Sequence, residues 1–336
     1  MKIRKYILFA VLLLLLPLSI AFDGGAASSR ESEALLGVSQ RVTVLCAGLD
    51  EAAGNTDVLV LITMDPQDKE ITMLQIPRDT YFSADTVQRK VNQLYPTYCA
   101  AGQDRDTAMA RLTRELSDAF GIKIDHYAAM EYSSIAYLVD RLGGITLNVP
   151  VDIRGQDGVL IPTGNRTLNG QEALSFIRYR AGYAEGDLAR IDAQKLLLLS
   201  VYKKVKNELS LTDLAALIPD LHKRVLTDMA VSRQISIAYA YIRDRADYTV
   251  RLVTLPGVAT RADGENGTWY YVVNKKSASG LLERYFDGRA FDPGARMTDA
   301  GRTHFTAIYE SNTVSYRIYT EETINELEIK TKQKDG

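Results

Sequence analysis

The chain has 336 residues, of which 46% are hydrophobic and 24% charged, a composition typical of a globular protein. Its 40 lysines and arginines and 42 aspartates and glutamates give a formal net charge of −2, which argues against a protein that binds nucleic acid through a general basic excess. The three histidines are far apart and match neither a zinc-site spacing nor a catalytic triad order, and two cysteines cannot form a disulfide framework.

The N-terminal segment predicts where the protein is located. A basic tail (residues 1–5) precedes an apolar run over residues 6–22, and a Gly-, Ala- and Ser-rich linker follows at 23–40. The run has roughly 17 residues, the lower limit for a transmembrane helix, and positive residues before such a helix stay in the cytoplasm. We therefore predict a single-pass anchor in the cell membrane with the rest of the chain on the extracellular side. A signal peptide cleaved near the small residues 26–29 is the alternative, and it places the chain on the same side.

The two cysteines would then lie where a disulfide bond persists. The sequence leaves two possibilities open for Cys46 and Cys99. They form one bridge, or they are two separate thiols.

From residue 41 onward, the hydrophobic pattern alternates between strands and helices. Short apolar or β-branched runs predict strands at 41–47, 58–64, 70–76, 122–130, 145–153 and 251–255. Apolar residues at helical spacing predict helices at 106–120, 133–142, 169–177, 188–205 and 231–241. A short turn at 65–68 makes the second and third strands an antiparallel pair. We expect an α/β domain over residues 41–290, with α-β-α layers around a central mixed sheet, and a C-terminal extension at 291–336.

Acidic residues and arginines gather where the predicted strands end and the helices begin. They are Asp50 and Asp57 around the first loop, Arg78 and Asp79 after the third strand, and Arg178, Arg180, Asp187 and Arg190 around the start of the long helix. Arginine offers a planar fork for phosphate oxygens, and paired aspartates suit Mg²⁺, which also takes substrate phosphates. Taken singly, each group is better explained as a solvated turn or a helix cap. Together they predict a site for phosphoryl transfer.

The order of these motifs resembles that of the LytR-CpsA-Psr family of cell-envelope glycopolymer transferases. The resemblance covers about residues 42–290. The matching segments are Thr56-Asp57, Ile76-Pro77-Arg78-Asp79-Thr80, Lys90-Val91-Asn92, Ile124-Asp125-His126-Tyr127, Leu142-Gly143-Gly144-Ile145, Val149-Pro150, Leu168-Asn169-Gly170-Gln171-Glu172-Ala173-Leu174, Arg178-Tyr179-Arg180 and Gly186-Asp187-Leu188-Ala189-Arg190-Ile191. The chain departs from the family pattern at Asn55 and Ala193, where the family has arginines.

The resemblance implies an enzyme that works at the outer face of the membrane. A glycopolymer such as teichoic acid or capsule, carried on polyprenyl diphosphate, would pass to a peptidoglycan hydroxyl group. A phosphodiester would form, with polyprenyl phosphate as the leaving group. The alternatives are a regulatory or polyprenyl-phosphate-binding protein without catalysis, named in the family as a transcriptional attenuator, and a polyprenyl-diphosphate hydrolase. The long helix after Arg190, apolar around most of its circumference, would wall a channel for the lipid tail unless it is simply a core helix.

The resemblance also implies roles for individual residues. Asp50 and Asp57 take the family's Mg²⁺ positions. The residues that would hold the diphosphate are Arg78, Arg178, Arg180 and Arg190. Arg78, Asp79 and Asp187 would form the catalytic group, in which one of the two aspartates orients the arginines or helps to deprotonate the acceptor hydroxyl.

Overall fold

The computed structural model describes residues 40–323 apart from short segments at 51–53, 83–85, 87–88, 157, 184–186, 263–266, 289–290, 293–304 and 321. The predicted basic tail and membrane anchor, nearly all of the linker and the end of the C-terminal extension lie outside the described residues. Within the described part, no helix combines the length and the hydropathy needed to cross a membrane.

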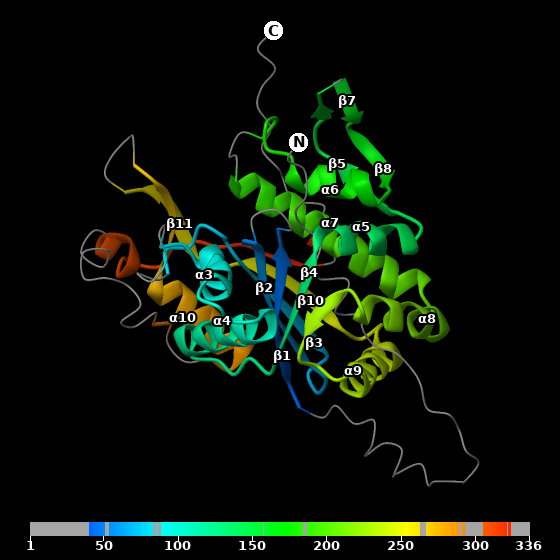
Figure 1. Cartoon of the computed structure of the whole chain (residues 1–336), viewed down its shortest axis with the longest axis horizontal. Coiled ribbons are helices and arrows are strands. Elements are labelled where there is room, and N and C mark those ends of the chain that lie inside the picture. Colours follow the sequence, from blue (N-terminus) through cyan, green and yellow to red (C-terminus); the bar gives the residue numbers. More distant parts are fainter. Residues whose placement is uncertain are drawn as a thin grey trace.

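A seven-stranded mixed sheet forms the centre of the molecule (Figure 1), with the strand order β13-β10-β3-β2-β1-β4-β9. The strands are β1 (Val42–Leu49), β2 (Thr56–Asp65), β3 (Glu70–Ile76), β4 (His126–Glu131), β9 (Val225–Thr227), β10 (Thr249–Thr254) and β13 (Ile318–Thr320). β1 runs parallel to β4 and β3 runs parallel to β10, whereas the other neighbours are antiparallel. The predicted mixed sheet and the antiparallel pairing of β2 with β3 are confirmed.

Helices cover both faces of this sheet (Figure 1). On one side lie α3 (Leu94–Ala100), α4 (Arg105–Phe120) and α10 (Lys275–Phe286). On the other side lie α5 (Tyr132–Arg141), α6 (Gly170–Arg178), α7 (Asp187–Glu208), α8 (Leu211–His222) and α9 (Val231–Asp244). All eight residues of β1 are buried, as expected for a strand covered on both faces.

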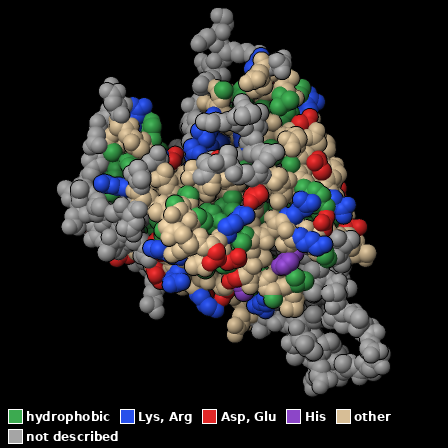
Figure 2. All heavy atoms as spheres, viewed as in Figure 1, with side chains coloured by type: hydrophobic (Ala, Val, Ile, Leu, Met, Phe, Trp, Pro, Cys, Tyr) green, Lys and Arg blue, Asp and Glu red, His purple; other side chains and the backbone are tan. Residues whose placement is uncertain are grey.

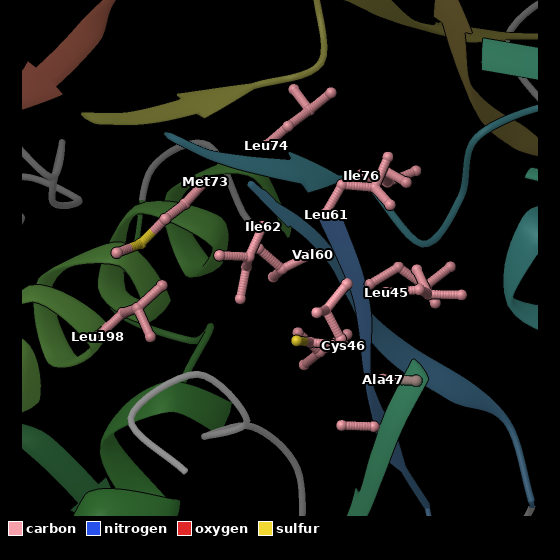
Figure 3. Packing of buried hydrophobic residues seen from close by; sticks show 14 of the residues in the cluster. Leu45, Cys46, Ala47, Val60, Leu61, Ile62, Met73, Leu74, Ile76 and Leu198 are labelled. Atoms are coloured by element: carbon pink, nitrogen blue, oxygen red, sulfur yellow. The ribbon is translucent and has the colours of Figure 1, made fainter. Parts of the chain in front are cut away.

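Alternate side chains of the central strands pack into the two helical layers (Figure 3). Ile62 of β2 is paired with Met73 of β3, and both point to the side of the sheet on which Leu198 of α7 lies. Leu61 and Leu74 are paired one residue along and point to the opposite face, where both are fully buried. Leu198 therefore belongs to the core, and the predicted lipid channel beside its helix stays a prediction.

Several short elements lie outside the main sheet. Three two-stranded antiparallel sheets pair β5 (Ile145–Val149) with β8 (Gly164–Leu168), β6 (Ile153–Gly155) with β7 (Gly158–Ile161) and β11 (Gly257–Arg261) with β12 (Trp269–Val273). The strand predicted over 145–153 is two strands, because Pro150 lies between them and has no backbone N–H for a sheet. β13, which lies in the predicted C-terminal extension, forms one edge strand of the sheet through its antiparallel pairing with β10.

The two cysteines are free thiols in this fold. Cys46 lies in the middle of β1, where burial raises its pKa, and Cys99 is half-buried on α3. The structure thus corresponds to the second of the two possibilities. On the outer surface, basic and acidic side chains are interspersed over the visible face (Figure 2), in keeping with the small net charge.

Candidate functional site

Four residues of alternating charge form a connected line where the central strands β2 and β3 meet the surface loops. The Arg78 Nη1 donates a hydrogen bond to Asp57 Oδ1 at 3.1 Å, and its Nε lies 3.8 Å from Asp79 Oδ2. Lys90 Nζ donates to the other oxygen of Asp79 at 2.8 Å. The Asp57 carboxylate is 1% exposed, whereas the Arg78 side chain is 18% exposed. A buried carboxylate requires such a partner, and the arginine remains accessible from one side.

The register of two strands brings Arg78 to Asp57. Leu59 of β2 is paired with Ile76, the last residue of β3, so continuing this register by two residues sets Arg78 opposite Asp57. The chain turns sharply here, because the backbone N–H and the hydroxyl group of Thr80 both donate to the Pro77 carbonyl, at 3.0 and 2.6 Å. The ion pair is therefore held by regular strand geometry and by a closed turn.

Asp50 lies at the same end of the β1–β2 pair. It directly follows Leu49, which is paired with Thr56, the neighbour of Asp57. The Asp50 N–H donates to the Asn55 carbonyl at 3.0 Å, and Gly54, with a φ of +68°, donates to the Asp50 carbonyl at 2.7 Å. The left-handed backbone at Gly54 favours glycine. This loop thus brings the two predicted Mg²⁺ ligands to one strand end.

Arg178 and Arg180 do not share an extended strand face. Arg178 is the last residue of α6, and the extended backbone begins only at Tyr179. The Arg178 guanidinium lies 5.3 Å from the ring centroid of Tyr132. That ring also lies beside the end of β1, since a Cβ built on Gly48 would lie 3.6 Å from it. Arg178 therefore faces the strand ends that carry the aspartates, while Arg180 is exposed beyond the helix.

Helix α7 carries the last of the predicted residues. Asp187 is its first residue, and Arg190, one turn further, is 1% exposed and among the largest fully buried side chains of the described residues. The helix is fixed across the sheet by a buried hydrogen bond of 2.5 Å from Gln75 Nε2 to Gln194 Oε1. Arg190 is thus an interior group, and enclosing its charge requires negative or polar surroundings.

Two residues of this region were not among the predicted site residues. Lys90 pairs with Asp79, and its only signal in the sequence was its place in the Lys90-Val91-Asn92 segment. Tyr132 joins Arg178 to the end of β1, and nothing in the sequence pointed to it.

The acidic residues fit a magnesium ion bound together with phosphate. Among the residues that the structure describes, no three His, Cys, Asp or Glu side chains gather into an all-protein metal cage. Mg²⁺ is usually held by one or two carboxylates, with substrate phosphates and water completing its shell. Asp50 and Asp57, which lie at one strand end beside Arg78, match that donor set.

Comparisons with known proteins agree with the motif order. The sequence profile of the LytR_cpsA_psr family matches residues 21–286. The polyisoprenyl-teichoic acid–peptidoglycan teichoic acid transferase TagU of Oceanobacillus iheyensis is 26% identical over 256 residues, which cover 75% of this chain and 77% of TagU. Two solved structures share the fold. TagV of B. subtilis has a TM-score of 0.61 at 22% identity, covering 75% of this chain and 99% of TagV. TagT bound to LIIa-WTA has a TM-score of 0.58 at 21% identity, covering 80% of this chain and 97% of TagT.

Proposed function

The chain belongs to the LytR-CpsA-Psr family, and we propose that it transfers a glycopolymer from polyprenyl diphosphate to a hydroxyl group of peptidoglycan. The observation that carries the proposal is the line of charges from Asp57 through Arg78 and Asp79 to Lys90, next to Asp50 and Arg178. Phosphoryl transfer is catalysed mainly by positioning and by cationic groups fixed around the phosphates. Distant relatives named as teichoic acid–peptidoglycan transferases support the same reaction.

In this reaction, the acceptor oxygen attacks the phosphorus atom that carries the glycopolymer. The P–O bond to polyprenyl phosphate breaks, and the acceptor hydroxyl proton passes to a base. Arg78 is accessible on one side while Asp57 holds it on the other, so its guanidinium can bind a phosphate without losing its place. Arg178 and Arg190 supply further positive charge from α6 and α7.

The two candidate acids receive different roles in this proposal. Asp79 has a cation on each side, Arg78 at 3.8 Å and Lys90 at 2.8 Å, which makes it a positioning residue for the arginine. Asp187, at the start of α7, is then the candidate that accepts the proton. When bound at Asp50 and Asp57, Mg²⁺ would neutralise charge on the diphosphate.

We further propose that the reaction takes place at the outer face of the cell membrane. The basic tail and the apolar run at residues 6–22 support a single-pass anchor with this orientation. Polyprenyl-linked substrates are held in the same membrane, so an anchored domain meets them at its surface.

A transfer assay tests the proposed function. The full chain in detergent is incubated with Mg²⁺, peptidoglycan and a labelled glycopolymer on polyprenyl diphosphate. We expect label on peptidoglycan and release of polyprenyl phosphate. Asp57→Asn should abolish transfer, whereas the exposed control Asp68→Asn should not alter it. Label released into solution would identify a hydrolase, and lipid binding without turnover would identify a regulatory protein.

A further inference from the structure

A cavity of about 270 Å³ lies beside the proposed site and has no part in the reaction described so far. It is enclosed by the start of α7, the corner between β10 and β11, strand β12 and the C-terminal segment that leads into β13. The side chains that give it chemical character are Asp192, Lys195, Tyr271, Tyr316, Arg317 and Tyr319.

This cavity lies close to the proposed site. One wall is formed by Asp192 and Lys195 of α7. Tyr271, on the opposite wall, donates its backbone N–H to the Asp79 carbonyl at 2.9 Å. Thr254, also in the wall, is the last residue of β10. Because β10 runs parallel to β3, the two strands end on the same side of the sheet, and Arg78 lies just after the end of β3. A molecule in the cavity would therefore lie next to the phosphate-binding residues.

The lining suits a sugar ring better than a lipid tail. Lys195 is 5% exposed and is held by an ion pair of 2.8 Å to Asp192. The Lys195 ammonium lies 5.4 Å from the ring centroid of Tyr319, and Arg317 lies 5.8 Å from the same ring. Sugar hydroxyl groups need both donors and acceptors, and the apolar C–H faces of a sugar ring pack on aromatic side chains. The charged pair and the tyrosine ring provide both kinds of contact.

The same surface continues along the β11–β12 hairpin. Ala259, in the cavity wall, is paired with Tyr271, and Arg261 is paired with Trp269. Alternate residues of a strand and their cross-strand partners share one face, so Arg261 and Trp269 extend the face that lines the cavity. Trp269 is 51% exposed, and its ring lies 4.7 Å from the Arg261 guanidinium. Because the hairpin projects from the body of the molecule (Figure 1), this face forms a track leading away from the site.

The C-terminal wall of the cavity lies beyond the residues that the family profile matches. The family match ends at residue 286, whereas Tyr316, Arg317 and Tyr319 come from the segment beyond it. β13 holds that segment in place by pairing with β10. The cavity is thus completed by a part of the chain outside the family match.

We define the acceptor track as the cavity at Asp192, Lys195 and Arg317 together with the Trp269 face of the hairpin. We propose that this track binds the glycan strand of the acceptor. The inference rests on the proposed function, because it takes the acceptor to be a polysaccharide. The sugar that receives the phosphate lies at the cavity, beside Arg78, and neighbouring sugars of the strand lie along the hairpin towards Trp269.

The test measures binding of soluble peptidoglycan glycan strands, stripped of their peptides, to the full chain in detergent by calorimetry. Trp269→Ala and Tyr316→Ala should each weaken glycan binding at least ten-fold, and both changes are at exposed positions that the fold tolerates. Val258→Ala, on the opposite face of the same hairpin and also exposed, is the matched control and should leave glycan binding unchanged. Binding of polyprenyl phosphate should be the same in all three variants.

The outcomes separate the track from the proposed reaction. Loss of glycan binding in both track variants, with lipid binding retained, supports the track. If the wild type shows no transfer in addition, the proposed function fails while the track stands. Wild-type glycan binding that both variants retain overturns the track, whatever the transfer assay gives. Undetectable glycan binding by the wild type, or a preference for free teichoic acid over the glycan strand, overturns it as well.

Discussion

The ion pair between Arg78 and Asp57 makes a quantitative prediction about stability and catalysis together. At 3.1 Å, the gross attraction in a medium of effective dielectric constant about 20 is about 5 kcal/mol. Desolvation of the Asp57 carboxylate and water at the partly exposed Arg78 offset much of this attraction. Removing Arg78 alone leaves a carboxylate that is 1% exposed without this partner, so Arg78→Ala should destabilise the fold by about 2–4 kcal/mol. Arg78→Lys keeps the charge and should cost about 1 kcal/mol.

Urea unfolding followed by circular dichroism checks these values, in a double-mutant cycle with Asp57→Asn. Because the double variant has neither charge, it should recover part of the loss, with a coupling free energy of about 2 kcal/mol. A coupling below about 0.5 kcal/mol would mean that the pair behaves as a solvated surface pair and would refute the reasoning. In the transfer assay, Arg78→Lys should lose at least ten-fold in rate while remaining folded, because an ammonium group lacks the fork that binds two phosphate oxygens. Full activity of that variant would contradict the assigned role.

Three further predictions concern the scaffold. Burial raises the pKa of Asp65, but hydrogen bonds from two backbone amides and from Arg41 outweigh this effect and lower it overall. The resulting stability is present above the unfolded pKa near 4 and is lost as the pH falls through the lower folded pKa. Asp65→Asn should therefore cost about 1 kcal/mol at pH 7 and progressively less as the pH falls below 4, as measured by Tm against pH. A difference in Tm that does not change with pH would contradict this. A Cβ on Gly170 would lie 2.2 Å from the Ala136 carbonyl oxygen, so Gly170→Ala should shift α6, lower the stability by more than 2 kcal/mol and weaken lipid binding through Arg178. Gly280→Ala, in an open helical position, should instead raise the stability by about 0.5–1 kcal/mol by denaturant titration.

The parts of the fold that the sequence predicted well are those set by local pattern. The strand predicted at 70–76 is β3 with the same ends, because a turn precedes it and Pro77 follows it. The helix predicted at 106–120 is α4, which begins one residue earlier because the Asp104 side chain accepts from the Thr107 N–H. In both cases the boundary is fixed by side chains within a few residues of the element.

The parts that the sequence did not predict depend on distant partners. Strand β13 has three residues, too few for any periodicity, and exists because β10 offers it an open edge. α8 and α10 were missed because Pro219 and Gly280 interrupt their patterns, although tertiary packing keeps both segments helical. The predicted site shows the same division. Two hairpin registers bring Asp50, Asp57 and Arg78 to one strand end. The helix predicted at 169–177 ends one residue later, so Arg178 belongs to the helix and Arg180 does not.

The proposed donor and acceptor sites are built from different segments, which bears on how one scaffold could serve different acceptors. In our proposal, the donor phosphates are held by groups from β2, β3, α6 and α7, all of which lie inside the region matched by the family. The acceptor is held by the β11–β12 hairpin, which lies inside the same region, and by a segment near residue 317, which lies beyond it. Changes in the acceptor-binding segments would leave the register between Asp57 and Arg78 intact, because neither segment takes part in the β2–β3 pairing. Acceptor preference can thus change by substitution at the Arg317 segment and the Trp269 face without loss of the phosphate-binding geometry.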